Sequence, residues 1–369
     1  MNYTKHICPI CSSRSLKDID INLPTFRHID FSTVSNRTLF KRCLHCNVVF
    51  NPNLISNELS VFKSKKYSES CQTHQKIKHN NICKSVTRST MQAKLIYEDI
   101  LPNNKFKVLD IGCFDGDLLN EISKLSSRGE YWGFDINSDV SSLFPKGDKF
   151  NFIDSSLSHI YEKFDLIILS HSILYIHNFS LLMSDTERLL KKDGTLYIQI
   201  PDISKNTHYS LMGDQLYIFT KDSLINSLRH YGFSEVSLNG SIFPREVVIS
   251  ARKDDGVKLI EYIYEDIFSI NMLRIKDSIN KLRKIKNDKI SVLGSTVNAA
   301  FVDEVIGNKI EFFVDENYSI NKKYFRGKPV YHPSKLNQNN LTVIPYQSDI
   351  GISIKDRFIK TYKGNFEVL

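Results

Sequence analysis

The sequence predicts an α/β protein whose centre is a doubly wound parallel sheet, with a cysteine-bearing module before it. Two observations support this prediction. From Lys107 onward, apolar strand-like segments alternate with helical ones, and two close cysteine pairs precede that region. A chain of 369 residues is long enough for two or three hydrophobic cores.

The charge balance favours acidic partners without specifying one. The chain has 49 Lys plus Arg against 41 Asp plus Glu, which gives a formal net charge of +8. Nucleotides and phosphorylated sugars are therefore better partners than neutral molecules. The excess is spread along the chain with no long basic run, so its simplest interpretation is a solvated, lysine-rich surface.

The beginning of the chain has no basic region followed by an apolar stretch, so we expect no signal peptide. The longest apolar tract, 164–176, is interrupted by Asp165 and His171 and is too short to cross a bilayer. We therefore expect a cytoplasmic protein. In that reducing environment the seven cysteines are better interpreted as thiols or metal ligands than as disulfides.

Four of the cysteines form two Cys-x-x-Cys pairs, a spacing that lets two thiolates reach one tetrahedral zinc ion from a tight turn. The alternative is that such pairs arose by chance. A site with four thiolate ligands has no open position for a substrate, so we expect a structural zinc ion. The loop between the pairs should contain strands, for which 19–23 and 48–50 are the candidates. The predicted ligands are Cys8, Cys11, Cys43 and Cys46.

The corner Val108-Leu-Asp-Ile-Gly-Cys-Phe-Asp-Gly-Asp-Leu-Leu119 joins a predicted strand, 108–111, to a predicted helix, 118–125. A second strand, 131–136, follows and contains Asp135 near its end. Strand, glycine turn, helix and strand-end acid are typical of a nucleoside site, in which the acid binds both ribose hydroxyls. We expect the glycines of the corner to let the backbone approach that ligand.

The spacing of the corner indicates which nucleoside it binds. The pattern is Asp110-x-Gly112-x-x-x-Gly116, which departs from Gly-x-Gly-x-x-Gly. An acid at the strand end would repel a pyrophosphate placed over the helix start but would attract a cationic amino-acid group. S-adenosylmethionine carries an ammonium and a sulfonium and has no phosphate, so it fits this corner better than a dinucleotide.

Later segments complete a sheet of seven strands, which is typical of a class I methyltransferase rather than a dehydrogenase. The further strands are expected at 150–154, 164–170, 195–200, 233–238 and 247–251, with a helix at 221–231. Asp154 and Ser155, at the end of the third strand, are expected near the adenine amino group. The full set of predicted cofactor-binding residues is Asp110, Gly112, Cys113, Phe114, Asp115, Gly116, Asp135, Ile136, Asp154, Ser155 and Ser170.

Taken together, these motifs resemble those of the sugar C-methyltransferases that join a four-cysteine zinc module, an S-adenosylmethionine domain and a second nucleotide-fold domain. The order of the pieces carries the resemblance over nearly the whole chain. The pieces are the two cysteine pairs, the glycine corner, Ser170-His-Ser-Ile-Leu-Tyr-Ile176, Tyr217-Ile-Phe-Thr220 with Gly232-Phe233, and Phe313-Val-Asp-Glu-Asn317 through Gly327-Lys-Pro-Val330.

The resemblance implies zinc, S-adenosylmethionine and a nucleotide-activated sugar, and a small Rossmann-like domain folded around 292–296. An apolar helical pattern over 259–285 should join that domain to the central one. The expected division is a zinc-binding module over 1–60, a linker and helix over 61–105, an S-adenosylmethionine-binding domain over 106–254, a connecting helix over 255–286 and the C-terminal domain over 287–369.

The chain departs from this family where the family's proton-abstracting histidine is expected. The family's Tyr-x-Glu-His element aligns with Met212-Gly-Asp-Gln215, and a second family histidine aligns with Tyr175. Glutamine cannot act as a base, so methylation of a sugar oxygen is favoured over methylation of carbon. His171, at the end of the fourth strand, is our first candidate for a catalytic base. The other candidates are His208, Tyr209 and Asp214.

Two other classes of function stay open at the level of sequence. Zinc and positive charge also occur in RNA methyltransferases and nucleic-acid-binding proteins, although no basic cluster interleaved with aromatic residues is present here. A catalytically silent scaffold that binds the cofactor is the third class. Contacts from the C-terminal domain to the methyl acceptor, through Ser295, Thr296 or Asn317, are expected from position alone, and helix capping is the alternative role.

Overall fold

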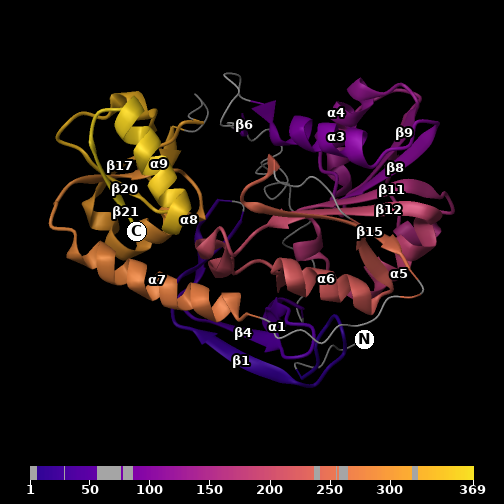
Figure 1. The fold of residues 1–369 in the computed structure, drawn as a ribbon, viewed down its shortest axis with the longest axis horizontal. Coiled ribbons are helices and arrows are strands. Elements are labelled where there is room, and N and C mark those ends of the chain that lie inside the picture. Colours follow the sequence, from indigo (N-terminus) through magenta and orange to yellow (C-terminus); the bar gives the residue numbers. More distant parts are fainter. Residues whose placement is uncertain are drawn as a thin grey trace. The chain divides into compact units, whose positions relative to one another are not determined.

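The structure is a computed structural model, and it describes residues 6–28, 30–55, 76–77, 86–236, 242–254, 256, 265–317 and 323–369. The chain forms two compact units, each assembled from separate stretches of sequence (Figure 1). The stretches of unit 1 are Met1–Ile19, Phe40–Asp202 and Gln215–Tyr264, and those of unit 2 are Asp20–Leu39, Ile203–Asp214 and Glu265–Leu369. This grouping does not test the domain boundaries expected from the sequence, which stay a prediction.

Unit 1 contains a seven-stranded sheet in the order β10-β9-β8-β11-β12-β15-β14. The strands from β10 to β12 are parallel, and β15 and β14 are antiparallel to their neighbours. This doubly wound order reverses direction at β8, where ligands of such sheets bind beyond the carboxyl ends of the strands. The strands are β8 (Phe106–Ile111), β9 (Gly129–Phe134), β10 (Phe150–Ile153), β11 (Phe164–Ser170), β12 (Leu190–Pro201), β14 (Phe233–Val236) and β15 (Glu246–Lys253).

Helices cover both faces of this sheet, which explains why its central strands are apolar along nearly their whole length. Leu119 and Ile96 pack with Val108 on one face, while Phe179 and Leu224 belong to the core on the other. The helices of unit 1 are α1 (Pro52–Ile55), α3 (Arg88–Asp99), α4 (Asp117–Leu125), α5 (Phe179–Leu189) and α6 (Lys221–His230), with short 3₁₀ turns η2 (Ser138–Ser142), η3 (Leu157–His159) and η4 (Ile173–Tyr175).

Side-chain caps define where two of these helices begin. Thr87 accepts a hydrogen bond from the backbone N–H of Thr90 at the start of α3. Thr220 and Ser223 form a reciprocal capping box at the start of α6. Each cap satisfies backbone groups that a helix end leaves without partners, so the sequence specifies both starts locally.

A four-stranded sheet in the order β1-β4-β5-β13 carries the amino-terminal cysteines. Its strands are β1 (Leu16–Ile21), β4 (Thr38–Cys43), β5 (Val49–Phe50) and β13 (Tyr217–Ile218). Tyr217 pairs with Phe50 across the last two strands, so a segment far along the chain completes this sheet. A short antiparallel pair, β6 (Lys76–Ile77) and β7 (Val86–Thr87), precedes α3.

Unit 2 contains a six-stranded sheet in the order β18-β19-β17-β16-β20-β21, parallel except for β18. It also contains a hairpin of β2 (Thr25–Phe26) and β3 (Thr33–Ser35). The sheet strands are β16 (Ile290–Leu293), β17 (Ile310–Val314), β18 (Tyr324–Phe325), β19 (Lys328–Tyr331), β20 (Leu341–Ile344) and β21 (Asn365–Val368). The helices are α7 (Ile267–Lys284), α8 (Val297–Ile306) and α9 (Ser348–Thr361), with turns η5 (Thr207–Leu211), η7 (Gly307–Lys309) and η8 (Pro333–Lys335).

Several predicted boundaries differ from the observed ones by a few residues. The second strand of the large sheet ends at Phe134, so Asp135 follows it instead of belonging to it. The strand expected at 19–23 is β1, which begins and ends earlier. The helix expected over 259–285 is described as α7, and residues 259–264 of that prediction lie outside the described residues.

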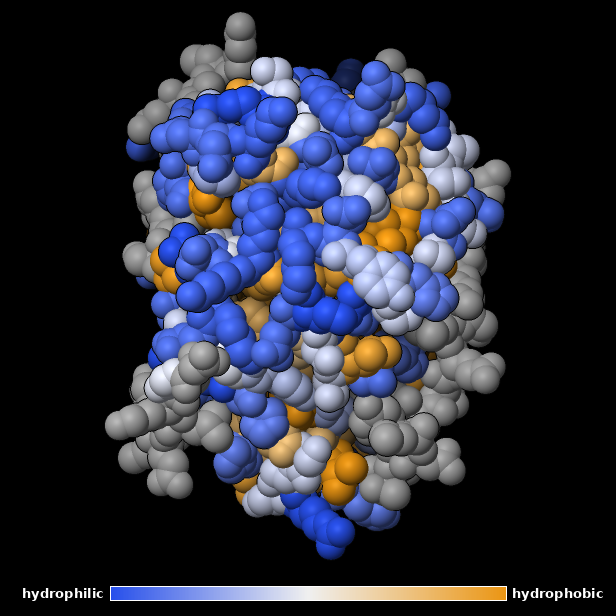
Figure 2. All heavy atoms as spheres, turned by 90° about the vertical axis from the view of Figure 1, so that its right-hand side faces the viewer, coloured by the Kyte–Doolittle hydropathy of each residue, from blue (hydrophilic) through white to orange (hydrophobic). Residues whose placement is uncertain are grey.

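Polar side chains cover most of the face of the molecule drawn in Figure 2, and apolar atoms reach its surface in separate patches. Among the described residues, no helix is both long enough and apolar enough to cross a membrane.

Candidate functional site

The corner between β8 and α4 is a left-handed turn at three positions. Gly112, Phe114 and Gly116 have φ values of 85°, 49° and 74°. The backbone N–H of Gly112 donates to the carbonyl oxygen of Phe134 at 2.7 Å, which fixes the turn against the end of β9. Glycine occupies left-handed backbone at no steric cost. Gly112 and Gly116 therefore adopt this conformation without strain.

The two glycines are required for a reason that the sequence did not reveal. A Cβ atom added to Gly112 would lie 2.4 Å from the Cβ of Ser172, and one added to Gly116 would lie 2.7 Å from the ring of Phe144. We expected these glycines to clear space for a ligand. At both positions protein side chains fill the space, so packing and backbone conformation explain the glycines.

Asp135 connects the corner to the carboxyl end of β9. One carboxylate oxygen accepts the backbone N–H of Phe114 at 3.0 Å, and the other accepts the backbone N–H of Asn137 at 2.9 Å. Burial raises the pKa of Asp135, and the two backbone hydrogen bonds partly oppose that rise. A carboxylate has about four acceptor positions, so both oxygens keep capacity for ribose hydroxyls.

Asp110 is the most perturbed acid of the corner. Its side chain is buried, and burial together with the charges of Asp135 and Asp115 raises its pKa to about 8. Its Oδ1 atom is buried and makes no hydrogen bond to any described residue. A buried carboxyl without a partner is unfavourable, and a cation beside it would stabilise its ionised form. The residues present therefore fit the cationic amino-acid end of S-adenosylmethionine.

The remaining predicted cofactor residues lie at the carboxyl ends of neighbouring strands. Asp154 and Ser155 are exposed directly after β10, and Ile136 is 40% exposed after β9. Ser170 ends β11, where its hydroxyl accepts a hydrogen bond from Gln92 at 2.8 Å. Parallel pairing of these strands brings their ends to one edge of the sheet.

Cys113 differs from the other residues of the corner because its thiol points into the protein. It is 5% exposed, and burial raises the pKa of the thiol well above its usual value. A Cβ on Gly133 would lie only 2.7 Å from its sulfur. The side chain is therefore a packing residue, and only its backbone is available to a ligand.

His171 follows β11 directly and has φ of 60°, in the left-handed region. Such a conformation costs about 1–3 kcal/mol at a residue other than glycine, so surrounding contacts must maintain it. Its backbone N–H donates to the carbonyl oxygen of Gln199 at 2.8 Å. Its Nε2 lies 3.3 Å from a carboxylate oxygen of Glu246, and the side chain is 21% exposed.

Glu246 belongs to a buried polar network that the sequence analysis missed. Burial would raise its pKa, but the charge of Arg88 and the contacts with His171 and Gln199 lower it to about 2. The guanidinium Nε of Arg88 lies 3.1 Å from one carboxylate oxygen, and the side-chain amide of Gln199 donates to the other. The available signal was Gln199 itself, a polar residue inside an apolar strand.

Gln215 and Tyr175, where the family's histidines are expected, lie next to each other. The side-chain amide of Gln215 donates a hydrogen bond of 3.3 Å to the hydroxyl of Tyr175. Gln215 is 3% exposed and Tyr175 is half-buried. The two departures from the family therefore form one contact, which carries no basic nitrogen.

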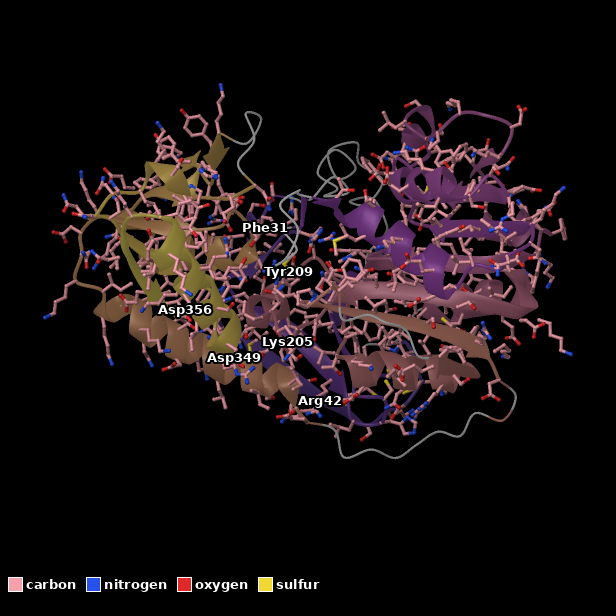
Figure 3. The ribbon with its side chains drawn as sticks, turned by 45° about the horizontal axis from the view of Figure 1, so that its top comes forward. Phe31, Arg42, Lys205, Tyr209, Asp349 and Asp356 are labelled. Carbon is pink, nitrogen blue, oxygen red and sulfur yellow. The ribbon has the colours of Figure 1, made fainter. Side chains whose placement is uncertain are left out.

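The other three candidates for a catalytic base lie in unit 2. His208 is 1% exposed, its ring centroid is 4.5 Å from that of Phe301, and burial lowers its pKa to about 4. Tyr209, labelled in Figure 3, is half-buried. Asp214 accepts the backbone N–H of His28 at 2.6 Å, and burial raises its pKa to about 7. The enclosed imidazole of His208 disfavours a role in proton transfer.

The two cysteine pairs form turns with the same hydrogen bonds. Ser12 N–H donates to the carbonyl of Cys8, and Asn47 N–H donates to the carbonyl of Cys43, both at 3.0 Å. Ser12 and Asn47 have φ values of 58° and 62°. Each turn thus presents both of its sulfurs on one side, as a zinc knuckle requires.

The four sulfur atoms meet in one cluster of unit 1. All of them lie within 4.8 Å of one another, with Sγ–Sγ distances of 3.6 Å between Cys8 and Cys46 and 3.5 Å between Cys11 and Cys43. Four ligands at about 2.3 Å from a tetrahedral zinc are separated by about 3.8 Å. The cluster fits a closed zinc site, and its buried members join the core beside β5 and β13.

Unit 2 has a second turn resembling the corner of unit 1. Gly294 follows β16 with φ of 91°, and its N–H donates to the carbonyl of Val314 at 2.7 Å. The hydroxyl of Ser295 donates to Asp315 at 2.6 Å, and the N–H of Asn317 donates to the same carboxylate at 2.9 Å. Thr296 stands at the start of α8 without capping it through its side chain, so the predicted capping role does not apply there.

The sheet order, the glycine corner and the strand-end acids define the fold as Rossmann-like and of the class I methyltransferase type. A family model described as a methyltransferase domain matches residues 83–238, which include the corner, Asp135 and His171. Residues 83–238 are therefore similar to a methyltransferase domain, and this match spans less than half of the chain.

Three of the solved structures that this chain resembles match it over less than half of its length. CalO1, a methyltransferase in calicheamicin biosynthesis, is 11% identical over 45% of this chain, with a TM-score of 0.37. The glycopeptide N-methyltransferase MtfA with S-adenosylmethionine is 11% identical over 48%, with a TM-score of 0.37 and 99% of its own length covered. The pyocyanin biosynthetic protein PhzM is 16% identical over 44%, with a TM-score of 0.36.

The matched part spans about half of two of these proteins, 54% of CalO1 and 55% of PhzM. A search of curated proteins found no match to the chain.

Proposed function

We propose that the protein is an S-adenosylmethionine-dependent methyltransferase that acts on a nucleotide-linked or otherwise activated sugar, in glycan or natural-product biosynthesis. The observation that carries the cofactor assignment is Asp110 at the glycine corner, a buried carboxyl whose Oδ1 makes no hydrogen bond to any described residue, within the stretch that matches a methyltransferase domain. The sugar is supported by the order of motifs in the sequence and by the net charge of +8.

When bound, S-adenosylmethionine would supply an electrophilic methyl group with a neutral leaving group. Asp110 would pair with its ammonium, and Asp135 would accept the ribose hydroxyls. Asp154 and Ser155 lie where the adenine of such sheets is expected. Much of the catalytic effect would come from positioning, because an in-line displacement needs the acceptor atom held near the methyl group.

A sugar hydroxyl is a poor nucleophile at neutral pH and needs a base to take its proton as the new O–C bond forms. We propose that His171 is this base. It lies at the carboxyl end of β11, is partly exposed, and contacts Glu246 through only one ring nitrogen. Its other nitrogen can receive the proton while the methyl group moves to the oxygen.

We propose methylation of oxygen in preference to carbon. Carbon methylation beside a ketone requires a base that removes a proton from carbon, and neither partner of the Gln215–Tyr175 contact supplies one near pH 7. A glutamine amide is not basic, and a tyrosine hydroxyl has a pKa of about 10.

We further propose that the four-cysteine cluster holds a structural zinc ion and that the protein acts in the cytoplasm. The zinc proposal is supported by the sulfur distances and the two matching turns. The location is supported by the thiol state of the described cysteines, which form no disulfide with one another.

Two experiments test the proposed function in sequence. Calorimetry on metal-loaded protein should show binding of S-adenosylmethionine and of S-adenosylhomocysteine, and absence of binding for both would refute the cofactor assignment. Incubation with methyl-labelled cofactor and a panel of nucleotide sugars should then transfer the label. Mass spectrometry and NMR should locate the label on oxygen, and label on carbon would contradict our assignment of the acceptor atom.

A further inference from the structure

We infer that Glu246 is a positioning residue that fixes which ring nitrogen of His171 is free to accept a proton. The inference rests on the proposed function, in which His171 is the base. It assigns the proton of neutral His171 to Nε2 and leaves Nδ1 for the acceptor hydroxyl.

The argument begins with the partners of Glu246. One carboxylate oxygen faces the guanidinium of Arg88 at 3.1 Å, and the other receives the side-chain amide of Gln199. Arg88 contributes an ion pair, and Gln199 donates a hydrogen bond. An ionised carboxylate has acceptor sites only, so it pairs with the cation, accepts from Gln199 and keeps room for a further donor.

The orientation of Gln199 is set independently. Its side-chain oxygen accepts hydrogen bonds from Tyr197 and from Gln92, the latter at 2.9 Å. The amide nitrogen is therefore the end that faces Glu246. The side chains of Tyr197 and Gln199 are fully buried, so water does not compete for these contacts.

His171 supplies this further donor. Its Nε2 lies 3.3 Å from the same carboxylate oxygen that receives Gln199. Because that oxygen can only accept, Nε2 must carry a proton, whether the ring is neutral or protonated. In neutral His171 the lone pair is then on Nδ1, which makes no hydrogen bond to any residue that the structure describes. This arrangement follows the general role of a carboxylate that orients a catalytic imidazole.

The first test reads the position of the proton without needing a substrate. The full-length, zinc-loaded protein with bound S-adenosylhomocysteine is labelled with ¹⁵N-histidine, and long-range ¹H–¹⁵N spectra are recorded at a pH where His171 is neutral. We expect one tautomer, with an exchange-protected proton on Nε2. In E246Q we expect loss of that protection and protonation shared between the two nitrogens.

His171→Asn assigns the signals, and Glu187→Gln is the matched control. Like Glu246, Glu187 pairs with a cation, in its case Lys253 at 2.8 Å, but its side chain is 53% exposed and its ion-pair partner is Lys253 instead of His171. The control should leave the spectrum unchanged. A proton on Nδ1 in the wild type, or an unchanged Nε2 proton in E246Q, would overturn the inference.

The second test uses the acceptor identified by methyl transfer. We expect E246Q to lower kcat on the order of 10²-fold with little change in KM for the cofactor, and to add almost nothing in the H171N background. Fully additive losses would show that Glu246 acts independently of His171. If H171N keeps wild-type turnover, the proposed base is wrong, whereas the tautomer result stands or fails by itself.

Discussion

At the scale of single residues, two unfavourable features lie at neighbouring strand ends. The buried Oδ1 of Asp110 makes no hydrogen bond to any described residue, and His171 has left-handed backbone. Strain and unsatisfied polar groups of this kind persist where function or surrounding contacts require them. In this protein they occur at the ends of β8 and β11, which are adjacent strands of the large sheet.

The raised pKa of Asp110 predicts a pH-dependent affinity for the cofactor. The pKa is about 8 in the folded protein, so the carboxyl is mostly neutral below that pH. If the cationic ligand binds the ionised form, affinity should rise about tenfold per pH unit up to about pH 8. Calorimetry from pH 6 to 8 should show this slope in the wild type and a much flatter one in D110N.

Asp139→Asn is the control for that experiment, because Asp139 is an exposed acid shortly after β9. It should reproduce the slope of the wild type. An equally steep slope in D110N would show that another group titrates.

The same pKa shift predicts a change in stability of the protein without ligand. The folded pKa of Asp110 is above its usual value of 3.8, so folding is favoured when the carboxyl is protonated. This contribution is fully present below about pH 4 and is lost as pH rises through about 8. The unfolding free energy is measured by urea denaturation across this pH range. The wild-type value should fall relative to that of D110N by a few kcal/mol as the pH rises. The difference between wild type and D139N should stay constant.

For His171, we predict that His171→Asn lowers turnover on the order of 10²–10⁴-fold with cofactor affinity nearly intact. Asparagine tolerates left-handed backbone better than alanine, so the substitution removes the base with little added strain. His159→Asn, at an exposed position, should leave turnover unchanged. Unchanged turnover in H171N would exclude the residue as the base.

At the scale of elements, the hairpin of unit 2 shows how segments far apart in the sequence are joined. The hairpin of β2 and β3 is connected to α8 through Arg326, which has φ of 48°. Arg326 pairs with Asp303 at 2.7 Å and with Glu304, and it donates to the carbonyl oxygen of Phe31 at 2.7 Å. This network is largely buried, so its members depend on one another.

We predict that Arg326→Met destabilises unit 2 by about 3 kcal/mol, because it removes the cation that pairs with the partly buried Glu304, whereas Asp303 keeps its contact with Lys328 at 2.6 Å. The measurement is the free energy of unfolding from urea denaturation. Arg37→Met is the matched control, since Arg37 pairs with Asp20 but is 72% exposed. Solvent screens that pair, so little change is expected. If both substitutions lowered the free energy of unfolding equally, burial of the Arg326 ion pairs would not explain the loss of stability.

The cysteine turns predict one zinc ion per chain. Removal of zinc by a chelator, or the change Cys46→Ser, should lower the unfolding temperature, because four close sulfurs lose the cation that holds them together. Metal content by elemental analysis and unfolding by calorimetry provide the measurements. Cys113→Ser should retain zinc, and full metal content in C46S would refute the ligand set.

At the scale of the whole molecule, neither compact unit is a single continuous stretch of the sequence. Unit 2 takes the segments 20–39 and 203–214 in addition to the C-terminal part. Three of the four candidate bases therefore group with the C-terminal domain, and His171 groups with the methyltransferase sheet. Sequence proximity in Met212-Gly-Asp-Gln215 hides this division, because it falls between Asp214 and Gln215.

The described fold predicts that cofactor binding stabilises the folded chain. A ligand that binds only the native state at 100 times its Kd adds about 2.7 kcal/mol to the unfolding free energy. S-adenosylhomocysteine should therefore raise the unfolding temperature of the wild type, and the increase should be smaller for D135N. A rise of equal size in D135N would remove Asp135 from the site.

The sequence by itself determined the features that depend on short-range patterns. Alternating apolar segments predicted the large sheet, and the two Cys-x-x-Cys spacings predicted a sulfur cluster, because pairing rules and turn geometry act over a few residues. Only the tertiary structure decided which side chains meet. Arg88, Gln199 and Glu246 are separated by long stretches of chain, and burial among them fixes their charges and proton positions. Desolvation and hydrogen bonding arise from three-dimensional surroundings, which residue spacing does not encode.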